Sequence, residues 1–291
     1  MNALNRVLGR PLSIVALGVF WAVGALPARG GIGAEIPWTT IEAEAMRISG
    51  TVLGPEYAPH RLETESSGQK CVQLSHAGEQ VEFDAPAAFD SLVIRFNLPD
   101  AATGGGTTST LDLLINGKPV QKLRLSSRNA WLYGDYPFSN DPKQGKPRNF
   151  YDELRVKDLK IAKGDVVRLQ KASDDGIACV IDLVDLELVP APVARPAGSL
   201  SVLDFGASGN GEGDDTTALR ACIAEARRQG RIVWVPAGDY KITGDIPVPS
   251  AVTIQGAGMW HTTFVGDAAL YGQPDRRVRF KLAGTGASLA E

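Results

Sequence analysis

Short β-rich runs near the C-terminal end of the chain are separated by gaps too short to hold crossover helices. The runs cover residues 231–236, 239–243 and 251–255, and proline- and glycine-rich turns divide them. Strands joined in this way cannot form a doubly wound sheet, so they must turn corners and stack. Each coil then buries its apolar face only on the next coil.

A single helix is predicted just before these runs. Leu219, Cys222, Ile223 and Ala226 recur at helical spacing within residues 217–229, which gives the helix one apolar face. A glycine-rich turn precedes it over residues 209–213, and Gly230 ends it. Asp214 or Asp215 can cap its first turn.

Four motifs in this part resemble the N-terminal cap of the pectate-lyase-like β-helix superfamily, which consists of secreted polysaccharide-degrading enzymes. They are Asp204-Phe205-Gly206-Ala207, Gly213-Asp214-Asp215-Thr216, Val235-Pro236-Ala237-Gly238-Asp239-Tyr240 and Val252-Thr253-Ile254-Gln255-Gly256-Ala257-Gly258. Residues 256–263 are similar to the mycodextranase or α-1,3-glucanase glycoside hydrolases. The resemblance implies that residues 200–291 are the cap and first coils of a right-handed parallel β-helix.

The N-terminus has the pattern of a secretory signal peptide. Arg6 and Arg10 precede an apolar run over residues 12–26, and small residues such as Ala28 and Ala34 offer cleavage points. A membrane anchor is the alternative, but the run is shorter than the ~20 apolar residues that span a bilayer. We expect residues 1–34 to be the signal peptide, the mature chain to start between residues 26 and 35, and the protein to be secreted with no membrane attachment.

Charge and cysteine content narrow the possible partners. Thirty basic and thirty-three acidic residues give a net charge of −3, which favours neither nucleic acid nor a charged membrane surface. Cys71, Cys179 and Cys222 show no C-x-x-C spacing, which argues against a zinc site. A Cys71–Cys179 disulfide and free, buried thiols both stay open, and Cys222 is free in either case.

Residues 38–188 consist of short strand-like runs with almost no helical periodicity. The expected strands are 39–45, 71–74, 80–83, 91–96, 110–115, 120–125, 166–170 and 178–188. Asn116-Gly117 predicts a hairpin turn between two of them. This spacing predicts an all-β fold in which a β-sandwich, a jelly roll, precedes the β-helix. The proline-rich residues 189–199 are the expected linker.

The two ends of this region resemble the first and last strands of carbohydrate-binding sandwiches. The matching segments are Ile41-Glu42-Ala43-Glu44-Ala45 and Ile181-Asp182-Leu183-Val184-Asp185-Leu186. The resemblance implies a structural calcium ion held by Glu42, Glu44 and Asp182. Alternate residues of a strand point the same way, so Glu42 and Glu44 would place two hard oxygen donors on one face. Ordinary solvated carboxylates are the alternative.

The loop over residues 129–151 carries six aromatic residues among polar ones, a mixture that suits stacking on sugar rings. We predict polysaccharide contacts from Trp131, Tyr133, Tyr136 and Asn140. Trp131 and Tyr133 alternate as strand neighbours would, so they are expected to form an exposed pair. The alternative is that the rings fill the end of the sandwich.

No catalytic residue is predicted in this chain. Glycoside hydrolysis needs two carboxyl groups that flank the scissile bond, but helix capping explains Asp214 and Asp215 without chemistry. His261 has no acidic neighbour in the sequence and is expected to be structural. The resemblance places the catalytic acids on middle coils of the β-helix. Since a β-helix needs at least three stacked repeats, we expect the chain to be the N-terminal part of a longer protein.

Two classes of function follow. The first is the N-terminal part of a secreted glycoside hydrolase on an α-glucan, with residues 38–188 as an appended glycan-binding module. The second is a secreted, non-catalytic glycan-binding or adhesion protein. A polysaccharide lyase on uronic-acid polymers is a further enzymatic alternative. Substrate linkage, retaining or inverting chemistry and oligomeric state do not follow from the sequence.

Overall fold

The computed structural model describes residues 37–148, 150–270 and 278–290. The predicted signal peptide lies outside the described residues. The described part is mostly β-structure with one α-helix, which confirms the predicted class. Within it, no helix is long and apolar enough to cross a membrane.

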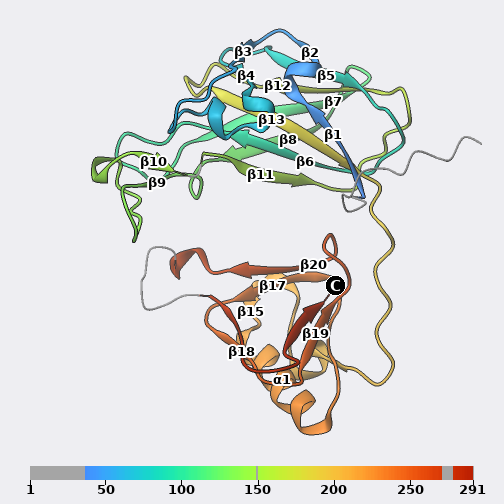
Figure 1. The fold of residues 1–291 in the computed structure, drawn as a ribbon. Coiled ribbons are helices and arrows are strands. Elements are labelled where there is room, and N and C mark those ends of the chain that lie inside the picture. Colours follow the sequence, from blue (N-terminus) through green and yellow to red (C-terminus); the bar gives the residue numbers. More distant parts are fainter. Residues whose placement is uncertain (1–36, 149, 271–277, 291) are drawn as a thin grey trace, which may run out of the picture. The chain divides into compact units, whose positions relative to one another are not determined.

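Residues 38–187, here called the two-sheet region, form two large sheets and one small two-stranded sheet, and every pairing in them is antiparallel (Figure 1). The first sheet has the order β11-β6-β13-β4-β3, and β1 also pairs with β13. Its strands are β1 (Trp38–Glu42), β3 (Thr51–Leu53), β4 (Cys71–Leu74), β6 (Ser91–Asn97), β11 (Asp152–Val156) and β13 (Cys179–Glu187).

The second sheet has the order β2-β5-β12-β7-β8. Its strands are β2 (Arg47–Ile48), β5 (Gln80–Asp84), β7 (Thr108–Ile115), β8 (Lys118–Ser126) and β12 (Val166–Lys171). Asn116 and Gly117 join β7 to β8 with φ angles of 50° and 74°, as the predicted hairpin turn requires. Alternate residues of β12, such as Val167 and Leu169, enter a hydrophobic cluster to which both sheets contribute.

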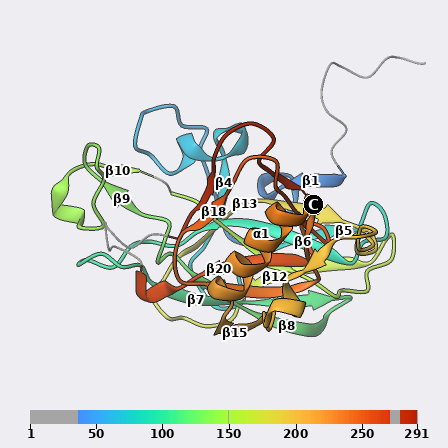
Figure 2. The same ribbon diagram turned by 90° about the horizontal axis from the view of Figure 1, so that it is seen from below.

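One end of the two-sheet region carries a small hairpin of β9 (Leu132–Tyr133) and β10 (Pro147–Arg148). Figures 1 and 2 both show it at the edge of the region. The short 3₁₀ helix η4 (Pro142–Gln144) lies in its loop. Three further 3₁₀ helices, η1 (Ala43–Ala45), η2 (Glu63–Glu65) and η3 (Ser67–Gln69), follow β1 and precede β4.

Residues 200–290, here called the parallel region, form three sheets in which every pairing is parallel. The sheet orders are β14-β16-β19-β22, β15-β17-β20 and β18-β21. The strands are β14 (Leu200–Ser201), β15 (Asn210–Asp214), β16 (Val233–Val235), β17 (Gly238–Ile242), β18 (Ile246–Val248), β19 (Thr253–Gly256), β20 (Thr262–Gly266), β21 (Phe280–Leu282) and β22 (Ser288–Ala290). The 3₁₀ helices are η5 (Val202–Phe205) and η6 (Ala268–Leu270). Strands close in sequence therefore fall in different sheets and pair with the next turn of chain.

Helix α1 (Thr216–Gln229) begins one residue before its predicted start (Figure 2). The four apolar residues of the predicted face are all buried in the cluster of the parallel region. Gly230 ends the helix at φ 64°, and its amide donates to the Ala226 carbonyl. A left-handed residue after a helix favours glycine because it has no Cβ.

Other expectations need correction. β1 ends at Glu42, so the strand expected over 39–45 is shorter, and Glu44 lies in η1. The glycine-rich segment expected to be a turn includes β15, whose backbone pairs with β17. All three cysteines are free and buried, which is the second of the two alternatives left open for Cys71 and Cys179.

Candidate functional site

Three aromatic rings pack together where the β9–β10 hairpin joins the two-sheet region. The rings of Trp131 and Tyr133 stack with centroids 6.3 Å apart, and Phe150 meets Trp131 edge-on at 5.2 Å. The Trp131 indole Nε1 donates to the Leu98 carbonyl at 2.9 Å. This fixed cluster forms the base from which the hairpin loop projects.

Asp100 holds this base to the neighbouring glycine loop. One carboxylate oxygen accepts from the amides of Ala101 and Gly106, and the other accepts from the Tyr133 hydroxyl at 2.8 Å. Burial, together with the Asp100 carboxylate, raises the pKa of Tyr133 above its ordinary value. Gly104, Gly105 and Gly106 have φ angles of 81°, 89° and 79°. Successive left-handed residues of this kind favour glycine.

The tip of the hairpin loop exposes two more rings. Tyr136 is 87% exposed and Phe138 is 43% exposed, and their rings meet edge-on with centroids 6.1 Å apart. The Arg148 guanidinium lies over the Phe138 ring at 5.5 Å from its centroid, and its Nε donates to the Gly134 carbonyl. Asn140 is half-buried in the same loop.

The predicted exposed pair of Trp131 and Tyr133 is wrong. Tyr133 is only 7% exposed and Trp131 is half-buried, because their rings pack on each other and on Phe150. Tyr136 is the exposed ring among the predicted contacts. The sequence reasoning missed Asp100 and the glycine loop, although three glycines in succession after an aspartate mark a turn that could have been noticed.

The residues of the predicted calcium site form a second cluster, beside η3. The Glu42 Oε1 atom accepts a hydrogen bond from the Ser67 hydroxyl at 2.7 Å. The Glu44 side chain lies close to Gly68, because a Cβ atom built on that glycine would be 3.5 Å from the Glu44 Oε1 atom. The Oε2 atoms of both glutamates are buried and have no hydrogen-bond partner among the described residues. Buried carboxylate oxygens without donors are costly unless a cation balances them.

Asp182 is fully buried at an irregularity of β13, where the pairing with β6 steps from Ile181 to Leu183. Such a bulge re-aims the extra side chain. One oxygen of Asp182 accepts from the Ser67 amide at 2.9 Å, and the other pairs with the Arg95 guanidinium. Burial raises the pKa of Asp182 to about 6, against the opposing charge of Arg95.

The three predicted ligands therefore differ in what they offer a cation. Glu42 and Glu44 each present a buried oxygen without a donor, whereas both carboxylate oxygens of Asp182 already accept hydrogen bonds. Across the described residues, no group of three or more His, Cys, Asp or Glu side chains is arranged to hold a metal ion. The two glutamates offer the kind of oxygen that a hard cation prefers, and each oxygen of Asp182 already accepts one hydrogen bond.

The carboxylates before α1 take part in local hydrogen bonds, and of the two predicted capping residues only Asp214 accepts from an amide of the first helical turn. The Asp214 carboxylate accepts from the Thr216 amide at 3.0 Å and from the Thr243 hydroxyl at 2.7 Å. Asp215 accepts from the Ser208 and Gly209 amides and so holds the preceding turn rather than the helix. These contacts give both carboxylates a structural role at the start of α1.

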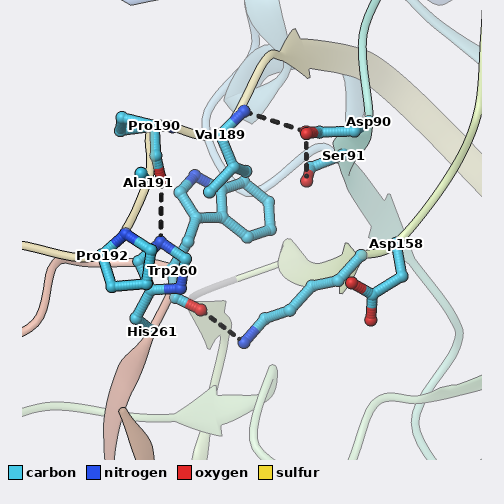
Figure 3. A pocket seen from close by; sticks show the side chains of 10 residues that line it. Asp90, Ser91, Asp158, Val189, Pro190, Ala191, Pro192, Trp260 and His261 are labelled. Carbon is cyan, nitrogen blue, oxygen red and sulfur yellow. Dashed lines mark hydrogen bonds between the residues drawn. The ribbon is translucent and has the colours of Figure 1, made fainter. Parts of the chain in front are cut away.

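Trp260, His261 and residues 189–192 line a pocket of 240 Å³ (Figure 3). The His261 Nε2 atom is 2.8 Å from the Pro190 carbonyl oxygen, and the Lys157 ammonium donates to the Trp260 carbonyl at 2.7 Å. The ring of His261 thus takes part in a structural contact, as expected, and we assign no chemistry to this pocket.

Comparisons with known proteins divide the chain in the same way as its sheets. Residues 35–189 match the family model described as alpha-1,3-glucanase catalytic domain D1. Residues 199–275 match the model described as rhamnogalacturonase A/epimerase, pectate lyase-like.

Solved structures of glucanases are similar to most of the chain. The Agl-KA catalytic domain is 29% identical with a TM-score of 0.75, and the match covers 87% of this chain and 46% of that one. The catalytic unit of a GH87 alpha-1,3-glucanase from Streptomyces thermodiastaticus strain HF3-3 is 34% identical with a TM-score of 0.72, over 89% of this chain and 44% of that one. A GH87 alpha-1,3-glucanase catalytic domain in complex with nigerose is 25% identical with a TM-score of 0.70, over 85% of this chain and 44% of that one.

Curated relatives match a shorter stretch. Mannuronan C5-epimerase AlgE3 of Azotobacter vinelandii is 41% identical over 70 residues, which are 21% of this chain and 4% of the relative. Alginate lyase 7 of the same organism is 40% identical over 70 residues, or 8% of its length. The chain spans less than half the length of the solved structures and a small part of the curated relatives. Because the first family model covers more than half of the chain, the chain belongs to the family of alpha-1,3-glucanase catalytic domain D1.

Proposed function

We propose that the chain is the N-terminal part of a secreted glycoside hydrolase that acts on an α-glucan. Membership of the alpha-1,3-glucanase catalytic domain D1 family is the observation that carries the proposal. The two-sheet region is then a jelly-roll β-sandwich that binds glycan, and the parallel region is the cap and first coils of a right-handed parallel β-helix. No residue of this chain is assigned a catalytic role.

The aromatic hairpin is the proposed glycan contact of the two-sheet region. Tyr136 supplies an exposed ring for stacking on a pyranose face. Trp131 and Tyr133 hold the base of the loop through their packing and their bonds to Leu98 and Asp100, and the half-buried Trp131 ring can add to the contact. Asn140 adds an amide for sugar hydroxyls.

We also propose that Glu42 and Glu44 hold a structural calcium ion. The buried Oε2 atoms without hydrogen-bond donors support the site, since calcium binds carboxylate and carbonyl oxygens. Asp182 supports the proposed site because it accepts a hydrogen bond from the amide of Ser67, whose hydroxyl donates to Glu42. The ion would neutralise charge that the two-sheet region otherwise buries.

Two measurements test the hydrolase proposal. The chain is incubated with insoluble α-1,3-glucan, and the bound fraction after sedimentation is compared with that on cellulose. The full-length secreted parent is then assayed for release of reducing ends from α-1,3-glucan. Binding and hydrolysis are both expected. Binding without reducing-end release would point to a glycan-binding or adhesion protein instead. Sequencing the N-terminus of the secreted form checks for a start between residues 26 and 35.

A uronic-acid polysaccharide is the second candidate substrate. The 70-residue matches to a mannuronan C5-epimerase and an alginate lyase favour it, although they cover a smaller part of the chain than the glucanase family does. A lyase would release products with a carbon–carbon double bond from alginate, and ultraviolet absorbance detects that bond. Such products, with no reducing ends from α-1,3-glucan, would replace the first proposal.

A further inference from the structure

A second exposed tyrosine lies in the loop between β3 and η2. Tyr57 is 72% exposed, yet the backbone that carries it is fixed. The Glu56 Oε1 atom accepts from the Tyr57 amide at 2.8 Å and from the Ala58 amide at 2.9 Å. The Thr64 hydroxyl donates to the Ala58 carbonyl at 2.7 Å. The ring therefore projects from an ordered loop without a packing role in the core.

Direct contacts tie this loop to the aromatic hairpin. The His60 Nδ1 atom is 3.2 Å from the Pro147 carbonyl oxygen on β10, and the Tyr151 hydroxyl donates to the Leu62 carbonyl at 3.4 Å. His60 itself has a φ of 66°, a conformation that side-chain-bearing residues adopt at a cost and that clusters at functional sites. The Tyr57 loop and the hairpin that exposes Tyr136 thus belong to the same end of the two-sheet region.

The chemistry of the exposed groups favours a sugar chain over a protein surface. In these two loops, the exposed large hydrophobic side chains are all aromatic: Tyr57, Tyr136 and Phe138. Protein interfaces have a contiguous apolar centre, whereas isolated rings with polar neighbours suit pyranose faces, which are apolar in the middle and hydroxylated at the rim. Arg61 and Asp135 are exposed in the same two loops and can bond hydroxyls.

We propose that Tyr57 and Tyr136 form a two-point platform for one extended, neutral glucan chain. Tyr57 stacks on one sugar unit, Tyr136 stacks on another, and Phe138 with Arg148 holds the Tyr136 ring from the side. The inference rests on the proposed glycan-binding function and adds Tyr57 as a contact residue and a requirement that the ligand reach both rings. An oligosaccharide too short to reach both rings uses only one of them and binds more weakly.

The test is the affinity of the full chain for linear α-1,3-gluco-oligosaccharides of increasing length, measured by calorimetry, and for insoluble α-1,3-glucan. Tyr57→Ala and Tyr136→Ala are each expected to weaken binding of the long oligosaccharides about tenfold, or about 1.4 kcal/mol. Tyr57→Phe keeps the ring and is expected to bind like the wild type. For oligosaccharides that reach one ring only, at most one of the two alanine variants weakens binding.

Val120→Ala is the matched control, because Val120 is 50% exposed on β8 and belongs to neither loop. Both tyrosines are surface side chains, and a circular dichroism spectrum like that of the wild type establishes that the variants fold. Wild-type affinity in Tyr57→Ala, with weaker binding in Tyr136→Ala, would overturn the two-point platform and leave the proposed function intact. A wild-type chain that binds no α-1,3-glucan would overturn both.

Discussion

The ammonium group of Lys171 is fully buried at the end of β12. Its Nζ atom donates to the Asp175 carboxylate at 2.7 Å and to the Ser109 hydroxyl at 3.0 Å. A buried cation keeps its charge only when a partner compensates its lost hydration. Asp175 therefore supplies the counter-charge for the buried ammonium of Lys171.

We expect Asp175→Asn to lower the free energy of unfolding by about 3 kcal/mol, because it leaves a buried ammonium without its counter-charge. Urea unfolding measures the change. The Asp112–Lys122 pair is the matched control, since its atoms lie 3.0 Å apart but Lys122 is well exposed. Asp112→Asn is expected to cost less than about 1 kcal/mol. Equal losses in both variants would show that burial does not set the strength of the Lys171 pair.

The same pair predicts a dependence on pH. Burial alone would raise the pKa of Asp175, but hydrogen bonds from Lys171, Ser109 and the Ile177 amide bring it down to about 2. A carboxyl whose pKa is lower in the folded state stabilises the fold above its unfolded pKa of 3.8 and loses this effect as the pH falls through 2. Between pH 4 and pH 2, the wild type should lose more unfolding free energy than Asp175→Asn. Parallel curves would contradict this assignment.

The sequence shows which kinds of residue a loop contains, but it does not show what each side chain contacts. Tyr133 is buried because its hydroxyl donates a hydrogen bond to Asp100 and its ring stacks on Trp131. Both contacts depend on the packing of two loops. Asp182 pairs with Arg95 at an irregularity in the pairing of β13 with β6. No pattern in the local sequence predicts this irregularity. The aromatic content of the hairpin loop was visible in the sequence, but the exposed fraction of each ring was not.

At the scale of elements, the glycine loop positions the aromatic hairpin. Gly104 and Gly105 have similar φ angles of 81° and 89°, but they differ in the space around them. A Cβ added to Gly104 would collide with the Asn140 carbonyl oxygen and lie 3.2 Å from the Pro142 ring, whereas one added to Gly105 would meet nothing within 4 Å. Gly104 thus allows the close approach of the hairpin loop.

The two glycines make a matched pair of substitutions. Gly105→Ala should cost about 1 kcal/mol of stability, which is the strain of a left-handed alanine. Gly104→Ala carries the same strain and also pushes the 139–142 backbone away, so it should cost at least twice as much and weaken binding to α-1,3-glucan. Urea unfolding and glucan sedimentation measure the two effects. Indistinguishable variants would mean that the hairpin does not depend on this contact.

Elements defined by local patterns were predicted well, and those defined by distant pairing were not. Helix α1 and the Asn116-Gly117 hairpin follow from residues close in sequence. β18 contains Pro247 and lies in a segment expected to be a turn, yet Ile246 and Val248 are buried and pair with β21. β15 is rich in glycine and becomes a strand because β17 runs beside it. Pairing partners of this kind come from the next turn of chain, which local periodicity does not report.

At the scale of the whole chain, two hydrophobic clusters with no shared residue stabilise the two-sheet and parallel regions. Glu42 and Glu44 adjoin only the first, through η1 and β13. A ligand that binds the folded state stabilises the unit that folds around it. A calcium ion at these glutamates should therefore act on one region and leave the other unchanged.

Hydrogen exchange with mass spectrometry separates the two regions peptide by peptide. Calcium at about a hundredfold excess over its dissociation constant should raise the free energy of global opening of the two-sheet region by about 2.7 kcal/mol. Addition of a chelator should return that free energy to its calcium-free value. Peptides from β1, β4 and β13 should gain protection, whereas those from α1 and β19 should not. The Glu42→Gln, Glu44→Gln double variant should show no calcium-dependent protection. It should also exchange no faster than the calcium-free wild type, because it removes the buried negative charge. Equal protection of both regions, or protection that persists in the double variant, would place the ion elsewhere.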